Sequence, residues 1–494
     1  MRTIGFDNEQ YLRLQSERIR ERIARFGGKL YLEFGGKLFD DYHASRVLPG
    51  FLPDSKIKML MEMRESAEIV IVINADDIER SKLRGDLGIT YDLDVLRLID
   101  AFREAGLYMG SVVITQYRAQ AAAEAFVARL RVVDVSVYIH SMIPEYPSNT
   151  ALVVSSEGFG RNDYIATTRP LIVVTAPGPG SGKMATCLSQ LYHEHLRGVN
   201  AGYAKFETFP IWNLPLKHPV NLAYEAATAD LGDVTMIDPY HLEAYGEPAV
   251  NYNRDVEVFP VLKAMLERIH GSSPYLSPTD MGVNMVGNCI VDDEAVQYAS
   301  KQEVLRRYFA AACNHRQGLG GQNEVLKIEL LMSELGITPT DREVVAPALA
   351  KAEMTHSPAV AIQLPSGETV TGKTSDLLGA ASSCLLNALK AMAGIDDAIM
   401  LISPEVIEPI ARLKVGHMGN RNPRLHTDEV LIALAISAVH DTSAARAMEQ
   451  LPRLWGCEAH ATVILSSVDD NQFQKLGVNV TCEPQFESSK VYRR

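Results

Sequence analysis

In the first half of the chain, short apolar runs alternate with longer segments in which apolar residues recur every three or four positions. The short runs are typical of buried strands, and the longer segments of amphipathic helices. Strands are expected at 29–34, 68–74, 111–115, 135–139 and 171–174. Helices are expected between them and over residues 8–25. This alternation predicts βαβ units, and therefore an α/β fold with a mostly parallel sheet.

The pattern changes after the middle of the chain. It weakens around residues 338–357, where we expect a domain boundary. Residues 359–364 and 368–371 flank Pro365-Ser366-Gly367, which indicates a β-hairpin. Further strands are expected at 399–402, 461–465 and 476–481, with helices between them. We therefore expect an α/β phosphate- or nucleotide-binding region over 1–340 and an α+β domain over 341–494.

The segment 171–196 has the order strand, glycine-rich loop, lysine, helix, which is the layout of a P-loop-like phosphate cradle. Backbone N–H groups of such a loop bind phosphate oxygens, and glycines leave room for the anion. The alternative is a structural turn with a surface lysine. The candidate cofactor-binding residues are Gly178, Gly180, Ser181, Gly182, Lys183, Met184, Ala185 and Thr186.

The match to G-x-x-x-x-G-K-[ST] is partial. Pro177 stands where the first glycine belongs, and Met184 where the hydroxyl that normally ligates Mg²⁺ belongs. Asp238 follows an apolar run at 234–237 and could hold a magnesium ion or its water, as an aspartate on a neighbouring strand does in nucleotide-binding proteins. Apolar strands that end in aspartate are common, so we expect phosphate or nucleotide binding more than catalytic ATP hydrolysis.

A second segment, 367–374, matches the P-loop expression in full. Its middle residues Thr369, Val370 and Thr371 favour a strand over a cradle, and the hairpin turn already accounts for Gly367. We therefore rank this match below the one at Lys183.

Two polar segments concentrate residues that carry chemistry. One is the loop 416–428, and the other lies at 314–316. Arginines clamp carboxylates or phosphates, and histidine transfers protons near neutral pH. The candidate catalytic residues are His417, Arg421, Arg424 and Arg316. The alternative is a solvated loop in which Thr427 or Asp428 caps the next helix.

Composition narrows the class of protein. The 494 residues are 47 % hydrophobic and 22 % charged, which is typical of a multidomain globular protein. The formal net charge of −13 argues against nucleic acid and anionic membranes as partners. The sequence has no long apolar stretch and no signal-like start, and its six cysteines form no C-x-x-C pair. We therefore expect a cytoplasmic protein.

Three segments together resemble a known family. They are Thr175–Thr186, Phe34-Gly35-Gly36-Lys37 and Thr371-Gly372-Lys373-Thr374-Ser375. The chain is similar over its whole length to an uncharacterised family of bacterial proteins of about this size. The resemblance implies a soluble bacterial protein and carries no reaction with it.

Three functional hypotheses follow. The first is an enzyme that acts on a phosphorylated small molecule or nucleotide at Lys183, with Asp238 holding a metal or a hydroxyl and a C-terminal residue such as His417 closing over the site. The second is a non-catalytic nucleotide-binding regulator or oligomeric assembly protein, which the absence of a hydroxyl at Met184 favours. The third is an enzyme whose site is formed by the 314–316 and 417–426 segments alone. A homo-oligomer is compatible with each.

Overall fold

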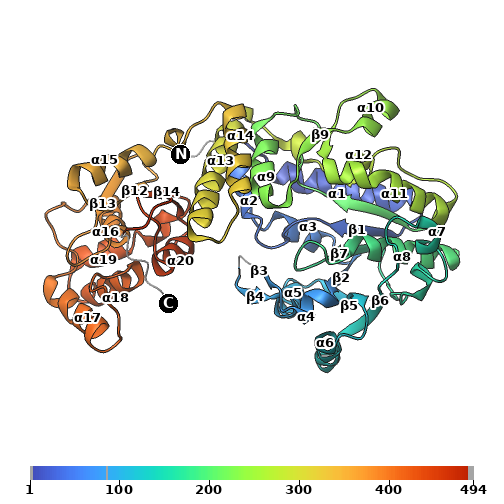
Figure 1. Cartoon of the computed structure of the whole chain (residues 1–494), viewed down its shortest axis with the longest axis horizontal. Helices are drawn as coiled ribbons and strands as arrows, with labels where there is room; N and C mark the ends of the chain where they lie inside the picture. The colour runs from blue at the N-terminus through green and yellow to red at the C-terminus, as the bar shows by residue number, and fades with distance from the viewer. Residues whose placement is uncertain (1–3, 85–86, 488–494) are drawn as a thin grey trace. The chain divides into compact units, whose positions relative to one another are not determined.

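The computed structural model describes residues 4–84 and 87–487 (Figure 1). The chain divides into two compact units, Thr3–Glu225 with Leu231–Ser300, and Ala226–Asp230 with Lys301–Arg494. We call them the N-terminal unit and the C-terminal unit and describe each by itself. The expected boundary at residue 340 stays a prediction.

A parallel sheet of seven strands, counted over the described residues, forms the centre of the N-terminal unit (Figure 1). The expectation of an α/β fold with a parallel sheet is thereby confirmed. The spatial order is β11-β8-β1-β7-β2-β5-β6, and every neighbouring pair is parallel. The strands are β1 (Leu30–Phe34), β2 (Ala67–Asn74), β5 (Tyr108–Tyr117), β6 (Ser136–Ser141), β7 (Leu171–Thr175), β8 (Gly202–Phe206) and β11 (Gly282–Val283).

Helices cover both faces of this sheet, which explains why its central strands are continuous apolar runs. All five residues of β7 are buried, as are Ala67–Ile73 of β2. The helices in sequence order are α1 (Asn8–Arg25), α2 (Tyr42–Val47), α3 (Ser55–Glu62), α4 (Ala75–Glu79), α5 (Tyr91–Glu104), α6 (Ala121–Val132), α7 (Thr150–Val153), α8 (Lys183–Leu196), α9 (Pro219–Ala227), α10 (Pro239–Tyr245), α11 (Asn253–His270) and α12 (Pro278–Met281).

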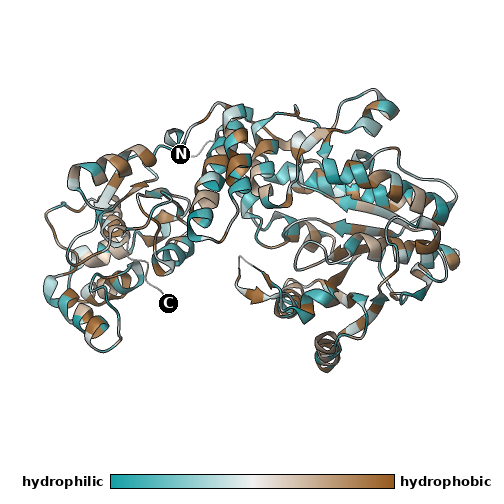
Figure 2. Cartoon of the chain, viewed as in Figure 1, coloured by the Kyte–Doolittle hydropathy of each residue, from teal (hydrophilic) through white to brown (hydrophobic). Residues whose placement is uncertain are grey.

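The two faces can be told apart by register. Tyr31 of β1 lies on the face that α8 covers, because its hydroxyl donates a hydrogen bond to Glu194 of that helix at 2.8 Å. Phe34 and Phe206 stack on the opposite face with ring centroids 4.0 Å apart, and Lys56 of α3 lies over the Phe206 ring. The predicted helix over residues 8–25 is α1, which Asp7 caps by accepting from the Gln10 N–H at 2.9 Å. Figure 2 shows α1 to be mostly hydrophilic.

The strand order creates a switch in chain direction beside β7. After β2 the chain proceeds outward to β5 and β6, whereas after β7 it proceeds to β8 and β11 at the other edge. The carboxyl ends of β2 and β7 are neighbours in the sheet. Open α/β sheets bind ligands at such a point, because the loops there leave in opposite directions and open a crevice.

Two small antiparallel sheets complete the strands of this unit. One pairs β9 (Thr235–Ile237) with β10 (Val250–Tyr252), and the other pairs β3 (Leu83–Arg84) with β4 (Ile89–Thr90). The strand that precedes Asp238 is therefore paired with β10 and not with the seven-stranded sheet.

The C-terminal unit contains a mixed sheet in the order β13-β12-β14-β15, with β14 and β15 parallel (Figure 1). The strands are β12 (Ala359–Gln363), β13 (Thr369–Lys373), β14 (Glu458–Ala461) and β15 (Asn479–Cys482). Helices α13 (Asp293–Gln317), α14 (Gln322–Leu335), α15 (Val345–Thr355), α16 (Ala380–Ala393), α17 (Pro404–Gly416), α18 (Thr427–Ser437), α19 (Thr442–Met448) and α20 (Ser467–Lys475) complete the order, α13 beginning in the N-terminal unit.

The hairpin expected around Pro365–Gly367 is confirmed by the antiparallel pair β12 and β13. The strand expected at 399–402 is wrong, because these residues form an irregular segment with no strand, which follows a turn closed by the Ile399 N–H donating to the Asp396 carbonyl oxygen at 3.1 Å. Leu401 and Ile402 are apolar because they are buried in the core of the unit, only 4 % and 5 % exposed. The strand pair expected at 461–465 and 476–481 is present as β14 and β15, which begin three residues earlier and three residues later than expected, at Glu458 and Asn479.

Across the described residues, no helix is both long enough and apolar enough to cross a membrane.

Candidate functional site

The loop between β7 and α8 leaves the sheet at the switch point. A Cβ on Gly178 would lie 2.1 Å from the Tyr91 hydroxyl oxygen, so a larger residue there would require the Tyr91 side chain to move. Gly180 and Gly182 have φ +76° and +92°, a left-handed conformation that glycine adopts at little cost, and Gly182 is the N-cap of α8. The path of the backbone thus favours glycine at Gly180 and Gly182, two of the glycines that the sequence marked.

The carbonyl groups of this loop are bound by side chains from neighbouring strands. Thr115, near the end of β5, donates its hydroxyl to the Ser181 carbonyl oxygen at 2.6 Å. The Ser181 hydroxyl donates to the Gly178 carbonyl oxygen at 2.8 Å, and the Asn74 amide nitrogen lies 3.5 Å from that of Gly180. In a trans peptide the C=O and the following N–H point in opposite directions. The N–H groups of Ser181 and Gly182 are therefore directed away from these tethers.

A run of N–H groups at the start of α8 has no acceptor. Among the described residues, no protein atom accepts a hydrogen bond from the backbone N–H of Gly180, Gly182, Lys183, Met184 or Ala185. No carboxylate of the described chain lies within 4.0 Å of the Lys183 ammonium. An N-terminus with unpaired N–H groups and the positive end of a helix dipole attracts anions.

The other candidate residues of this segment are less accessible. Thr186 is fully buried, and its hydroxyl has no hydrogen-bond partner in the described part of the chain. Ser181 is 1 % exposed, and its hydroxyl is used inside the loop. Met184 is half-buried at the position where a magnesium-binding hydroxyl would stand. Backbone groups and Lys183 are thus the parts of this segment best placed to meet a ligand.

Asp238 has a complete set of partners. It caps α10 by accepting from the N–H groups of Tyr240 and His241, and it also accepts from the N–H and the hydroxyl of Thr279, the latter at 2.6 Å. The side chain is fully buried. Among the described residues, no group of three or more His, Cys, Asp or Glu side chains is arranged to hold a metal ion.

The second P-loop match lies on strand β13. A Cβ on Gly372 would lie 2.2 Å from the Cys384 backbone nitrogen, so this glycine is required by the packing of α16 against β13. Lys373 is exposed at the end of the strand. The segment is part of a hairpin, as its residue types suggested.

The four candidate catalytic residues all belong to the C-terminal unit. Arg316 lies in the last turn of α13, 5.7 Å from the centre of the Phe486 ring, and the Arg424 guanidinium lies 3.2 Å from the carboxylate of the adjacent Glu487. Arg316 and Arg424 therefore both lie beside the adjacent residues Phe486 and Glu487. His417 and Arg421 are exposed, and neither makes a side-chain hydrogen bond or ion pair within the described residues.

One pair beside these residues was not foreseen. His426 Nδ1 lies 2.9 Å from Asp469, and the Ser466 hydroxyl donates to the same carboxylate oxygen at 2.7 Å. The hydrogen bond to Asp469 raises the pKa of His426, while His426 and other donors hold the pKa of Asp469 below its usual value against the effect of burial. Asp469 is on α20, and no spacing in the sequence indicates that it meets His426.

A charged cluster at the ends of β1 and β8 was also missed. The Lys205 ammonium lies 2.9 Å from Glu207 and also pairs with Asp255 in the first turn of α11. The Tyr203 hydroxyl donates to Glu33 at 2.7 Å. Burial raises the pKa of Glu207 to about 7, with Asp255 and Glu33 adding to the rise and Lys205 opposing it. The only sequence signal was alternation over 203–209, which placed Lys205 and Glu207 on the same face of a strand.

Comparison with known proteins assigns the chain to a family. The family model described as "Domain of unknown function DUF1846, N-terminal" matches residues 4–336, and the corresponding C-terminal model matches residues 340–492. The chain belongs to the DUF1846 family. It is 60 % identical to a UPF0371 protein of Streptococcus thermophilus and 59 % identical to one of Streptococcus pneumoniae, over 494 residues and 100 % of each chain. The expected bacterial family is thus confirmed, and the printed names carry no activity.

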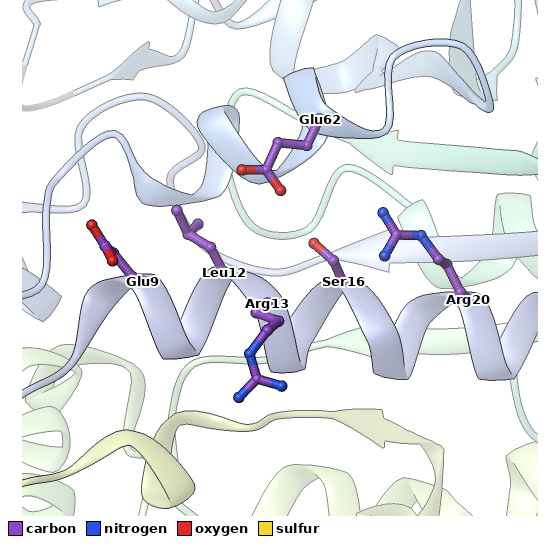
Figure 3. A pocket seen from close by; sticks show the side chains of 6 residues that line it. All are labelled: Glu9, Leu12, Arg13, Ser16, Arg20 and Glu62. Carbon is purple, nitrogen blue, oxygen red and sulfur yellow. The ribbon is translucent and has the colours of Figure 1, made fainter.

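Cavities of the DUF1846 chain also lie along α1, away from the glycine loop. One, of about 420 Å³, lies between α1 and Glu62 of α3, and Figure 3 shows Leu12 and Ser16 pointing toward α3 while Arg13 points away from it. Its lining mixes acidic, basic and apolar side chains without a common chemistry. The other, of about 320 Å³, is lined by residues that include Arg22, Trp212 and His241.

Proposed function

We propose that the chain binds the phosphate group of a small molecule or nucleotide at the loop between β7 and α8. The N–H groups of Gly180, Gly182 and Lys183 hold the phosphate oxygens, and the Lys183 ammonium supplies the counter-charge. The observation that carries the proposal is the run of N–H groups without an acceptor at the start of a fourteen-residue helix. Its place at the switch point of the sheet supports it independently.

The proposal does not route binding through magnesium. Met184 offers no hydroxyl, and Asp238 already accepts four hydrogen bonds, so a metal there would have to displace Thr279 or the helix cap. Breaking a buried set of charge-assisted hydrogen bonds is costly. We therefore propose that protein groups alone balance the charge of the phosphate. The candidate catalytic residues of the C-terminal unit remain His417, Arg421, Arg424 and Arg316.

The test is ligand binding by the full chain and by Lys183→Ala. Inorganic phosphate, ATP, GTP and glucose 6-phosphate are titrated while the unfolding temperature and the heat of binding are recorded. A ligand present at about 100 times its Kd stabilises the native state by about 2.7 kcal/mol, so a binder gives a clear rise in Tm. Loss of the ammonium is expected to weaken binding about tenfold or more, as the loss of a charge-assisted hydrogen bond does.

Lys58→Ala is the matched control. Lys58 is an exposed lysine of the same unit, on α3, and within the described part of the chain it pairs only with Asp54, at 2.8 Å. It removes the same charge from the surface without touching the loop. The absence of a Tm shift with any of the four ligands would overturn the proposal, as would equal affinities of the Lys183→Ala and Lys58→Ala variants.

A non-catalytic regulator or assembly protein is the second candidate function. Met184 favours binding without turnover. Helix α18 favours self-association, since Ile432 and Ile436 lie one turn apart and are 61 % and 56 % exposed. Release of phosphate from a bound nucleotide would exclude the regulator, and an unchanged mass in light scattering after Ile436→Glu would remove the support for assembly through α18.

A further inference from the structure

The charged cluster lies at the carboxyl ends of β1 and β8. The glycine loop leaves the carboxyl end of β7, so both are on the same side of the parallel sheet. Glu33 is paired in register with Val174 of β7 on one side and with Lys205 of β8 on the other. Its side chain is on the face covered by α8, where its charge acts on Cys187 in the first two turns of that helix. Because adjacent strands are about 4.8 Å apart, the cluster begins about 5 Å from the strand that leads to the loop.

This cluster has an excess of negative charge. Glu33, Glu207 and Asp255 supply three carboxylates, and across residues 4–84 and 87–487 Lys205 is the one ammonium that pairs with them. Gly282 leaves room for the Glu207 carboxylate, since a Cβ there would lie 2.9 Å from Oε2. The raised pKa of Glu207 follows from the same imbalance, because burial and two like charges oppose its ionisation.

The cluster is also open to a ligand. The side chains of Lys205 and Asp255 are each 24 % exposed and that of Glu207 is 12 % exposed, so all three reach solvent. Tyr252, by contrast, is 5 % exposed and its hydroxyl has no hydrogen-bond partner in the described part of the chain. Glu207 is among the charges that act on this hydroxyl. An unpaired buried hydroxyl beside surplus carboxylates indicates a polar group that is to be supplied from outside.

The ligand group that binds at this cluster has to carry a positive charge. Carboxylates that lack a cation bind either a metal ion or an organic ammonium, whose N–H groups donate charge-assisted hydrogen bonds. The described residues contain no cluster with a metal-ligand arrangement. An ammonium therefore fits the cluster better. Within the described residues Glu33 pairs with no protein cation, and Glu207 shares the Lys205 ammonium with Asp255.

We propose that the ligand of this chain is a phosphorylated amine, whose phosphate binds at the loop before Lys183 and whose ammonium binds between Glu33 and Glu207. This inference rests on the proposed function, because it uses the same loop for the phosphate. A ligand that spans the two positions has its nitrogen about 5–10 Å from its phosphorus, given that Glu33 is one strand and Glu207 two strands from β7.

The test compares two probes that differ in one group. Glucosamine 6-phosphate carries an ammonium where glucose 6-phosphate carries a hydroxyl, and calorimetry measures the affinity of each for the full chain. We expect glucosamine 6-phosphate to bind about tenfold more tightly, the effect of one charge-assisted hydrogen bond. Glu33→Gln and Glu207→Gln should each abolish this preference, so that the two probes bind the variant with equal affinity, because glutamine keeps the shape and removes the charge.

Glu257→Gln is the control, since Glu257 is an exposed residue of α11 two positions from Asp255. It should keep the preference. Equal affinities of the two probes, with binding still lost in Lys183→Ala, would overturn this inference and leave the proposed function standing. A preference that survives both Glu→Gln variants would also overturn it. No binding of either probe or of inorganic phosphate would remove the proposed function and this inference together.

Discussion

The hydroxyl of Thr115 donates to the carbonyl oxygen of Ser181 at 2.6 Å, and this contact joins strand β5 to the loop before α8. The two residues are 66 positions apart in the chain and meet because β5 lies two strands from β7. By fixing one peptide of the loop, Thr115 sets the direction of the Gly182 N–H. The anion-binding geometry thus depends on a residue outside the loop.

Thr115→Val is expected to destabilise the native state by about 1–3 kcal/mol, since it leaves a buried carbonyl without its donor while keeping the shape of the side chain. Urea unfolding measures the loss, and phosphate titration should show weaker binding. Thr186→Val is the control, because the Thr186 hydroxyl is equally buried and has no hydrogen-bond partner among the residues that the structure describes. That variant should be neutral or slightly more stable. Equal losses for the two variants would show that the Thr115 contact contributes nothing.

Alanine substitutions at two glycines of the loop distinguish the cost of backbone strain from the cost of steric crowding. Gly180 and Gly182 have φ +76° and +92°, so an alanine at either position costs about 1–2 kcal/mol. At Gly180 the new methyl group meets no atom within 4 Å, whereas at Gly182 it lies 3.1 Å from the Thr115 hydroxyl oxygen. Gly182→Ala should therefore lower Tm more than Gly180→Ala, by differential scanning calorimetry. A larger effect at Gly180 would contradict this account of the loop.

Much of the N-terminal unit was predictable from the sequence, because its strands are apolar runs that end where polar residues begin. The β7 strand and the existence of a helix after the glycine loop follow from residue types alone, as does the assignment of 367–374 to a hairpin, whereas the start of α8 at Lys183 is a finding of the structure. A strand was wrongly expected at 399–402, because Leu401 and Ile402 are apolar for packing in a core and not for pairing. Over only four residues, a buried segment that pairs with no strand has the same run of apolar residues as a buried strand.

The site was harder to predict than the fold, for a different reason. The backbone of the loop is local in sequence and leaves a signature in its glycines. The Glu33–Lys205–Glu207 cluster is assembled by register between β1 and β8, and its members are 172 and 2 positions apart by residue number. Single charged residues at strand ends carry no mark of their neighbours. The pairing of His426 with Asp469 escaped detection for the same reason.

The pKa of Glu207 predicts a specific dependence of stability on pH. Its native value of about 7 is above the ordinary value of 4.5, so the native state holds a proton that the unfolded state releases. Stability contributed by protonated Glu207 is therefore present below about pH 4.5 and lost as pH rises through 7. Glu207→Gln removes this loss. The Tm of the variant relative to the parent should rise between pH 5 and pH 8, by about 2–4 °C for each kcal/mol gained.

The groups that face Glu207 define the control for this measurement. They are Lys205, Asp255 and Glu33, of which only the lysine favours ionisation. Glu257→Gln changes an exposed carboxylate on α11 and should give a Tm difference that does not vary over the same pH range. A pH-independent difference for Glu207→Gln would mean that this carboxyl is ionised in the native state at neutral pH.

The stability of the C-terminal unit depends on a buried arginine. Arg342 is fully buried, and its guanidinium donates to Glu458 at 2.7 Å and to Thr481 at 2.9 Å, as well as to the carbonyl oxygens of Ala459 and Asn479. These acceptors lie on β14 and β15, so one side chain joins the two strands to the segment before α15. Arg342→Met removes these hydrogen bonds and, although Arg306 still donates to Glu458 at 3.1 Å, should cost about 3–5 kcal/mol. Arg342→Lys should recover only part of this, because an ammonium cannot reproduce the planar set of donors.

Hydrogen exchange locates this effect without assuming a single unfolding transition for a chain of two units. In Arg342→Met, the backbone amides of β14 and β15 should exchange faster by about two to three and a half orders of magnitude, which corresponds to the expected loss of stability at 1.4 kcal/mol per factor of ten. Those of β7 and β2 should keep their rates, because they belong to the other sheet. Arg412→Met, at an exposed position of α17, is the matched control and should leave all four strands unchanged. Faster exchange of β7 in Arg342→Met, as fast as that of β14, would mean that the two units unfold together and that Arg342 stabilises the whole chain.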